Sequence, residues 1–280
     1  MLTISIDPVA FTIGALTVRW YGIMVAIAVV SALAITLREV KRLNLSQDVY
    51  ALFLWGIVGG FIGGRLAHVI DYWDYYIANP RELIGFAGLA LYGTIIGVIV
   101  AVWIYMRIRR VPFSSLAGMG DAVAVGVPVA QAMGRLGCTL NGCCFGKPSP
   151  FQSFPGAVIY TPRDTIPSEY WGVPLYPAQI YFLVWNLIVF AILWRLRGKL
   201  QPQGSLFFLY LCLYAAGDFG LRFFRVNDPF LFGLHQGQVI SLAILVVAVP
   251  WLIIRIRRFQ KQALRNEIPN EAELGQSHED

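Results

Sequence analysis

The chain has 280 residues, of which 57% are hydrophobic and 14% are charged, and its formal net charge is +6 at pH 7. Soluble domains usually carry roughly 25% charged residues, and a soluble core has too little room for this much apolar surface. The basic residues flank apolar runs and form no stripe or tail, which excludes nucleic-acid binding as the reason for the charge. The composition therefore predicts a polytopic membrane protein that forms one helical bundle.

The N-terminal segment, residues 1–22, has neither the basic start nor the small-residue cleavage site of a signal peptide. We expect it to be an amphipathic segment that lies at the membrane interface before the first span.

Seven apolar runs follow in chain order, each long enough to cross a hydrocarbon core of about 30 Å. They cover residues 20–37, 49–70, 84–106, 115–133, 178–194, 205–221 and 236–254. The fourth run is rich in Ala and Gly, which favours close packing between membrane helices. The sequence thus predicts an all-α fold with about seven transmembrane helices. These form a single domain over residues 1–265, followed by a polar, disordered cytoplasmic tail over residues 266–280.

The basic residues alternate between the connections, and this alternation predicts the orientation. They follow the first, third, fifth and seventh runs as Arg38, Lys41 and Arg42; Arg107, Arg109 and Arg110; Arg195, Arg197 and Lys199; and Arg255, Arg257, Arg258, Lys261 and Arg265. Because basic connections remain in the cytoplasm, we expect the N-terminus outside and the C-terminus in the cytoplasm. The long outer loop 138–177 is then a candidate functional segment.

Charged residues at membrane depth are costly and indicate a functional site by default. Arg65 closes a glycine-rich run, where its side chain could equally extend to the outer headgroups. Asp218 and Arg222 are four residues apart, so they share a helix face and could form a purely structural ion pair.

Arg135 is harder to explain structurally, because Gly134 and Gly137 flank it and let a ligand approach closely. Together with Arg222 and Arg225 it would gather several guanidinium groups at one level of the outer leaflet. Guanidinium groups suit phosphate in a dry site, so an anionic phospholipid headgroup is the expected ligand.

Three of the four cysteines, Cys138, Cys143 and Cys144, cluster on the outer side, whereas Cys212 lies within the sixth run and is expected to be inert packing. A zinc site wants four ligands, and no His is near these three in sequence, so we predict no metal site. The alternatives are a disulfide such as Cys138 to Cys143 and simple filling of a tight turn. The chain also lacks any Ser-His-Asp or His-Glu-x-x-His arrangement, which leaves a standard hydrolase without support.

Short motifs along nearly the whole chain resemble, in order, those of the prolipoprotein diacylglyceryl transferases. They are Trp20-Tyr21-Gly22; Gly63-Gly64-Arg65; Tyr92-Gly93; Gly134-Arg135-Leu136-Gly137 with Asn141-Gly142 and Gly146; Pro177, Gln179 and Tyr181; Arg222-Phe223-Phe224-Arg225 with Asp228; and Gln236-Gly237-Gln238 with Ser241. The chain departs from the family pattern in several places. Cys138 and Cys143 stand where the family usually has Asn and Glu, and Tyr92 stands where it usually has His. Near Asp218 and Arg222 the family's usual order of Arg and Glu is reversed.

The resemblance implies transfer of the diacylglyceryl group of phosphatidylglycerol to the lipobox cysteine of a prolipoprotein. A thioether forms and glycerol 1-phosphate leaves, without a cofactor. The substrate supplies the nucleophile, so the enzyme needs cations on the departing phosphate and a group that takes the thiol proton. The implied partners are phosphatidylglycerol, lipobox signal peptides and the bilayer of the bacterial cytoplasmic (inner) membrane, with no nucleic acid.

The resemblance also implies the site residues. Arg135 and Tyr92 are the expected catalytic residues, and the expected phosphatidylglycerol-binding residues are Arg135, Arg222, Arg225, Tyr21, Asn141 and Gln238. Two alternatives remain at this point: a non-catalytic phospholipid-binding or transport protein, and a paralogue that acts on another acceptor.

Overall fold

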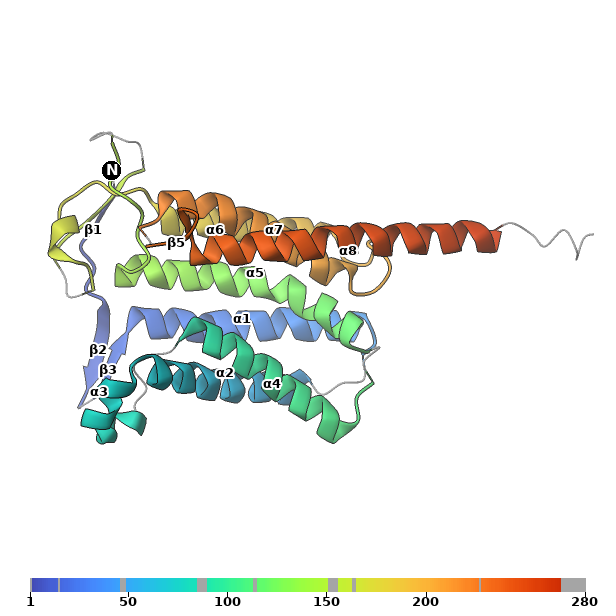
Figure 1. Cartoon of the computed structure of the whole chain (residues 1–280), viewed down its shortest axis with the longest axis horizontal. Coiled ribbons are helices and arrows are strands. Elements are labelled where there is room, and N and C mark those ends of the chain that lie inside the picture. Colours follow the sequence, from blue (N-terminus) through green and yellow to red (C-terminus); the bar gives the residue numbers. More distant parts are fainter. Residues whose placement is uncertain are drawn as a thin grey trace, which may run out of the picture. The chain divides into compact units, whose positions relative to one another are not determined.

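The computed structural model describes residues 2–267, apart from 15, 46–48, 85–89, 113–114, 151–155, 163–164 and 227. Helices make up most of this part of the chain (Figure 1). They are α1 (Trp20–Arg42), α2 (Val49–Asp71), α3 (Trp73–Ala78), α4 (Leu91–Arg109), α5 (Ser115–Asn141), α6 (Ala178–Leu196), α7 (Ser205–Leu221) and α8 (Gln236–Glu267). The chain divides into two compact units, one of residues 1–39 with 117–280 and one of residues 40–116.

Six helices in the described part are long and apolar enough to cross a membrane. They cover Trp20–Arg42, Tyr50–Asp71, Ser115–Asn141, Ala178–Leu196, Ser205–Phe224 and Gln236–Arg265, and a shorter apolar helix covers Tyr92–Ile108. The prediction of a mostly helical fold with about seven apolar helices is therefore confirmed, including the run rich in Ala and Gly. The last helix continues to Glu267, two residues into the predicted tail, and the rest of that tail lies outside the described residues.

The third apolar run differs from the expectation that it begins at residue 84. Pro80–Ile84 forms a 3-10 turn, η1, and α4 begins only at Leu91. The carbonyl oxygens of Glu82 and Leu83 accept hydrogen bonds from the Arg65 guanidinium. Hydropathy shows where a helix can lie in a bilayer, but it does not determine the first helical residue.

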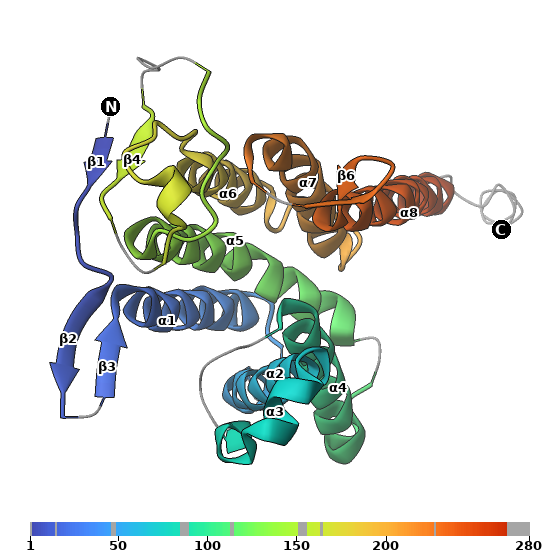
Figure 2. The same cartoon turned by 60° about the vertical axis from the view of Figure 1, so that its left-hand side comes forward.

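The segment before α1 folds as strands. β2 (Val9–Ile13) and β3 (Leu16–Arg19) form an antiparallel hairpin, and β1 (Leu2–Ile4) pairs in parallel with β4 (Val158–Tyr160). Figure 2 shows β1 beside β4. A small apolar cluster forms around this pair from Ile4, Val158, Tyr160, Ile166 and Leu175. The N-terminal strand therefore helps to order the long loop 138–177.

In the first unit, buried polar groups fasten the helices to one another. The Asp121 carboxylate accepts hydrogen bonds from the backbone N–H groups of Gly204 and Phe207, at 2.6 and 2.9 Å, and so caps the start of α7. Buried Glu39 pairs with Arg197 at 2.9 Å. An apolar core cluster in this unit consists of Ala124, Val125, Val189, Leu193, Leu206 and Tyr210.

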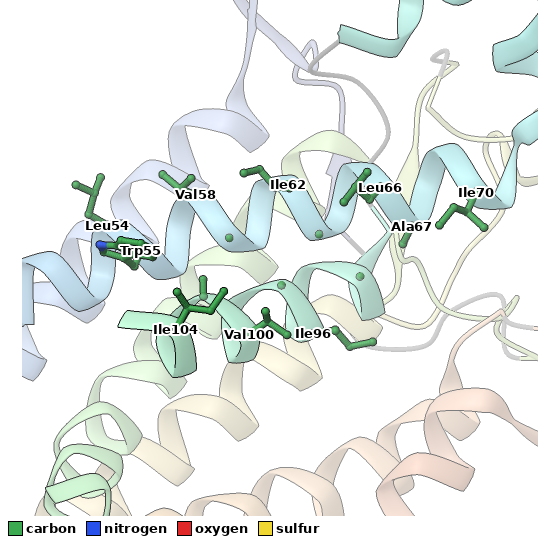
Figure 3. Close-up of a pocket in the computed structure, with 15 residues that line it drawn as sticks. Leu54, Trp55, Val58, Ile62, Leu66, Ala67, Ile70, Ile96, Val100 and Ile104 are labelled. Atoms are coloured by element: carbon green, nitrogen blue, oxygen red, sulfur yellow. The ribbon is translucent and has the colours of Figure 1, made fainter. Parts of the chain in front are cut away.

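In the second unit, α2 and α4 approach closely because glycines line their contact. A Cβ on Gly97 would stand 2.1 Å from the carbonyl oxygen of Gly59, and one on Gly63 would stand 2.4 Å from that of Gly93. Such small-residue contacts are typical of packed membrane helices. The two helices border an apolar groove of about 670 Å³, and Figure 3 shows branched side chains of both helices around it.

Candidate functional site

Two of the predicted arginines meet at one aromatic ring. Arg135 lies near the end of α5, and Arg225 follows the short 3-10 helix η3 (Arg222–Phe224). Their guanidinium carbons lie 4.3 and 6.0 Å from the centroid of the buried Phe182 ring in α6. Stacking on a ring face is favourable for a cation and also fixes the plane of the guanidinium group. Three elements that are distant in sequence therefore bring two positive charges together.

Neither of these guanidinium groups pairs with a carboxylate of the described residues. Within that part of the chain, Nε of Arg225 is buried and has no hydrogen-bond partner. Burial lowers the pKa of Arg225, and the positive charge of Arg135 lowers it further, although Cys144 opposes the shift. Two half-buried cations at one place favour an anion beside them, and their planar donor sets suit phosphate.

Arg222 has a different environment, because its charge is balanced inside the protein. Its Nε donates to Oδ2 of Asp218 at 2.5 Å, and the Ser241 hydroxyl donates to the same oxygen at 2.9 Å. Gly237 lies directly beneath the guanidinium group, since a Cβ there would stand 2.1 Å from the Arg222 Cζ. The ion pair expected from the spacing is present. A contact of Arg222 with lipid phosphate stays a prediction.

Gln238 is buried and connects the beginning of α8 to the end of α7. Its side-chain oxygen accepts from the His235 backbone N–H at 3.0 Å, and its amide nitrogen donates to the Phe219 carbonyl at 3.1 Å. In this structure Gln238 thus supports the backbone around the ion pair between Asp218 and Arg222. Its contact with lipid stays a prediction.

The turn that follows α5 has a fixed backbone. The amide groups of Gly142 and Cys143 donate to the Cys138 carbonyl, and the Gln179 side chain donates to the Cys143 carbonyl at 3.0 Å. At Gly146 only glycine fits, because a Cβ would stand 2.3 Å from the Tyr176 carbonyl oxygen. The next residue, Lys147, donates its backbone N–H to the Phe224 carbonyl at 2.8 Å. This turn is consequently attached to η3 and to Arg225.

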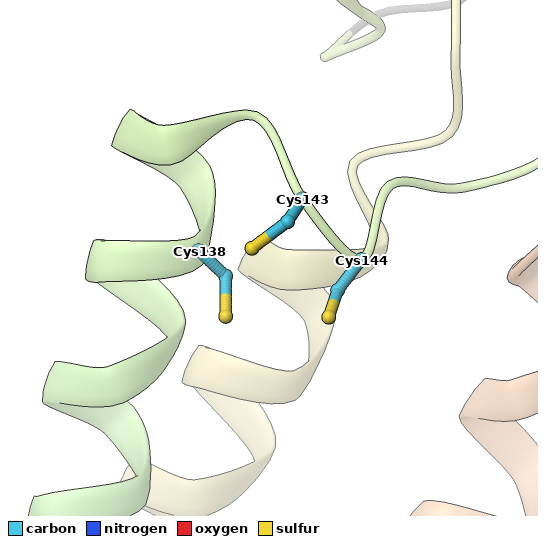
Figure 4. A group of neighbouring side chains, drawn as sticks. All are labelled: Cys138, Cys143 and Cys144. Carbon is cyan, nitrogen blue, oxygen red and sulfur yellow. The ribbon is translucent and has the colours of Figure 1, made fainter. Parts of the chain in front are cut away.

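The three clustered cysteines lie within this turn and the last turn of α5. Their sulfur atoms all lie within 4.8 Å of one another, and all three are free thiols (Figure 4). The disulfide between Cys138 and Cys143 that the sequence left open is therefore absent. Hydrogen bonds from the other two thiols, together with the charges of Arg225 and Arg135, hold the pKa of the Cys144 thiol below its usual value.

The remaining predicted residues lie in different places. Tyr21 in α1 packs against Gly137, where an added Cβ would stand 3.3 Å from the Tyr21 ring. Asn141 is the last residue of α5, and its side-chain oxygen is buried without a hydrogen-bond partner in the described part of the chain. Tyr92 belongs to the second unit, where it lies in the first turn of α4 and is 40% exposed, and its catalytic role stays a prediction.

Arg65, also in the second unit, is only 9% exposed. Its guanidinium group donates to two backbone carbonyls of η1 and lies 5.1 Å from the centroid of the Tyr76 ring. Arg65 is therefore held by contacts within its own unit, and its position relative to lipid headgroups stays a prediction.

Sequence reasoning missed Phe182 and did not include Gln179 among the site residues. Phe182 gives no signal of its own, because one more aromatic residue in an apolar run looks like packing. Gln179 does give one: it is an amide in the first turn of a membrane helix, and the structure shows it 1% exposed. A buried amide of this kind is expected to have dedicated partners.

Comparison with known proteins gives a consistent result. Residues 8–254 match the family model described as prolipoprotein diacylglyceryl transferase. A phosphatidylglycerol–prolipoprotein diacylglyceryl transferase of Dehalococcoides mccartyi strain 195 is 40% identical over 95% of this chain and 100% of its own length. Proteins with the same name from Lysinibacillus sphaericus and Nostoc sp. are 32% and 31% identical, over 91% and 97% of this chain and 94% and 96% of their own lengths.

Proposed function

The chain belongs to the prolipoprotein diacylglyceryl transferase family and is a phosphatidylglycerol–prolipoprotein diacylglyceryl transferase, in which we propose that Arg135 and Arg225 bind the phosphate of the lipid. The observation that carries this proposal is their shared position on the Phe182 ring, with no carboxylate partner among the described residues. The substrates are phosphatidylglycerol and a prolipoprotein with a lipobox cysteine.

The reaction needs positive charge where the phosphate leaves. The acceptor sulfur loses its proton and attacks the glycerol carbon next to the phosphate oxygen. A carbon–sulfur bond forms while the carbon–oxygen bond breaks, and glycerol 1-phosphate departs with the electron pair. Negative charge grows on the bridging oxygen in the transition state, so two fixed cations at the phosphate stabilise that state more than the bound lipid.

In our proposal the ion pair between Asp218 and Arg222 holds this site in place. Arg222 is neutralised by Asp218 and adjoins the segment that carries Arg225, whose backbone N–H donates to the Arg222 carbonyl at 3.1 Å. A rigid η3 would hold the Arg225 guanidinium in place before the lipid arrives, and such pre-organisation is what makes a charged contact effective.

The orientation with the N-terminus outside and the C-terminus in the cytoplasm is part of the proposal. The helix α1 ends in Lys41 and Arg42, α6 has Arg195 in its last turn, and α8 has Arg265 there. Arg135 and Arg225 lie at the opposite end of the bundle, where α5 and α7 end and α6 and α8 begin. Basic ends in the cytoplasm would put the site at the outer face of the inner membrane, where secreted precursors emerge.

The proposed function is tested with purified protein in lipid vesicles. The protein is incubated with phosphatidylglycerol labelled in its acyl chains and with a lipobox peptide. We expect label to appear on the peptide, and a matched peptide with Ser in place of the lipobox Cys to stay unlabelled. Absence of label on the Cys peptide, with folded protein in the vesicles, would contradict the function.

A further inference from the structure

The three clustered thiols have the arrangement of a metal site. We propose that Cys138, Cys143 and Cys144 bind one thiophilic d10 cation, with Zn²⁺ as the representative, and leave its fourth coordination position open to the acceptor thiol. The first part stands on the structure alone, and the second part rests on the proposed transferase function. It departs from the expectation from sequence, where three cysteines without a nearby His gave no reason to predict a metal.

The spacing of the sulfur atoms fits such a cation. Zinc–sulfur bonds are about 2.3 Å, which puts the sulfurs of a tetrahedral site about 3.8 Å apart. The observed sulfurs already lie within 4.8 Å of one another, so small side-chain rotations bring all three onto a common centre. A disulfide, by contrast, needs two sulfurs at about 2.05 Å and would leave the third thiol alone.

The backbone is also arranged for convergence of the three side chains. Cys144 adopts a φ of 59°, in the left-handed region that is uncommon for a residue with a side chain, directly after Gly142 at 78° and Cys143. Backbone in this region costs of order 1–3 kcal/mol and persists where the surroundings impose it. Gln179, fixed by the Tyr160 hydroxyl at 3.0 Å, holds the Cys143 carbonyl in position.

The fourth position is open in the described part of the chain, because no His, Asp or Glu there joins the three cysteines. Structural zinc sites are closed by four protein ligands, whereas catalytic ones have three and admit a substrate or water at the fourth. Three thiolates on Zn²⁺ leave one negative charge, which is smaller than the combined charge of +2 on Arg135 and Arg225 near Cys144. The surroundings thus favour an open site of catalytic type.

An open zinc–thiolate position would supply a group that makes the acceptor thiol nucleophilic. Binding of Zn²⁺ by the three cysteines releases three protons, and binding of the acceptor thiol as fourth ligand releases one more. The bound sulfur attacks the glycerol carbon, the carbon–oxygen bond to phosphate breaks, and glycerol 1-phosphate leaves. The neutral thioether is a weaker ligand than a thiolate, so the product dissociates and the position reopens.

The test begins with binding. Reduced, metal-free protein in detergent is titrated with Co²⁺, whose absorption spectrum reports thiolate ligands and tetrahedral geometry. We expect one Co²⁺ per chain, displaced by Zn²⁺, in the wild type and in the control Cys212→Ser. We expect the thiolate bands to be lost in Cys143→Ser and Cys144→Ser at matched, monodisperse protein levels. Absence of these bands in the wild type, or a disulfide within the cluster in protein isolated under alkylating conditions, would overturn the site.

The second step separates the two parts of the proposal. A lipobox peptide should change the Co²⁺ spectrum of the wild type, and the same peptide with Ser in place of Cys should not. Zn²⁺ loading should raise transfer of diacylglyceryl label by about a hundredfold over metal-free protein. Equal transfer by metal-free protein would refute the role of the metal and leave the proposed function intact. Metal binding without transfer in any form would instead refute the proposed function and leave the metal site.

Discussion

Replacement of Arg135 tests the phosphate site most directly. Its guanidinium group stacks on Phe182 at 4.3 Å and pairs with no carboxylate of the described residues, so Arg135→Ala leaves no carboxylate of these residues without its partner. The structural cost is then the stacking contact, about 1 kcal/mol. The catalytic cost is larger, because loss of one pre-organised donor to developing charge typically costs about 3 kcal/mol, on the order of a hundredfold in rate.

Arg135→Lys separates charge from geometry. The ammonium group keeps the positive charge but cannot donate two parallel hydrogen bonds or stack flat on the ring. We therefore expect this variant to be badly impaired as well, with activity above that of Arg135→Ala. Arg258→Ala is the matched control, since Arg258 is exposed on α8 at the end far from the site.

The assay is transfer of labelled diacylglyceryl to a lipobox peptide in membranes that contain equal amounts of each variant. Thermal unfolding in detergent verifies that Arg135→Ala retains its fold. Near-normal transfer by this variant would refute the reasoning, and the phosphate would then have to be held by Arg222 or Arg225.

Three further predictions follow from the contacts of the first unit and from the basic helix ends. Asp218→Ala removes the buried carboxylate from Arg222 and should lower the free energy of unfolding by about 3 kcal/mol, measured by denaturation in detergent; an unchanged stability would contradict the pairing seen here. Gly146→Ala should distort the turn after α5 and reduce transfer at least about tenfold, because the added Cβ overlaps a backbone carbonyl oxygen; wild-type activity would mean that the turn can shift at no cost. A reporter that functions only in the cytoplasm should be active when fused after Arg265 and silent at Pro150, and the reverse result at either position would refute the orientation.

The sequence predicted the helices well because a bilayer imposes one simple requirement, a long apolar run, on every span. It predicted neither the start of α4 nor the N-terminal strands. The residues before α4 include a 3-10 turn whose carbonyl oxygens bind Arg65, and the N-terminal strand β1 pairs with β4, which is far away in sequence. Neither contact leaves a periodic pattern.

At the candidate site, residue types were predictable and their partners were not. Arg135 and Arg225 were both recognised as costly cations, yet nothing in the sequence shows that they share the Phe182 ring. The cysteines illustrate the opposite case. Their spacing placed them in one turn, but a count of four ligands argued against metal, and only the positions of the sulfur atoms show that three converge.

The parallel pairing of β1 with β4 has a consequence for biogenesis. β1 precedes all the described helices and leaves the ribosome before them, whereas its partner strand follows α5. In the proposed orientation the N-terminus crosses the membrane early, and β1 must stay unpaired on the far side while the intervening helices are inserted. Contacts between segments so distant in sequence form late. The loop that carries the cysteine turn is thus completed only after most of the bundle is in the membrane, so the protein acquires its site as one of the last steps of its own assembly.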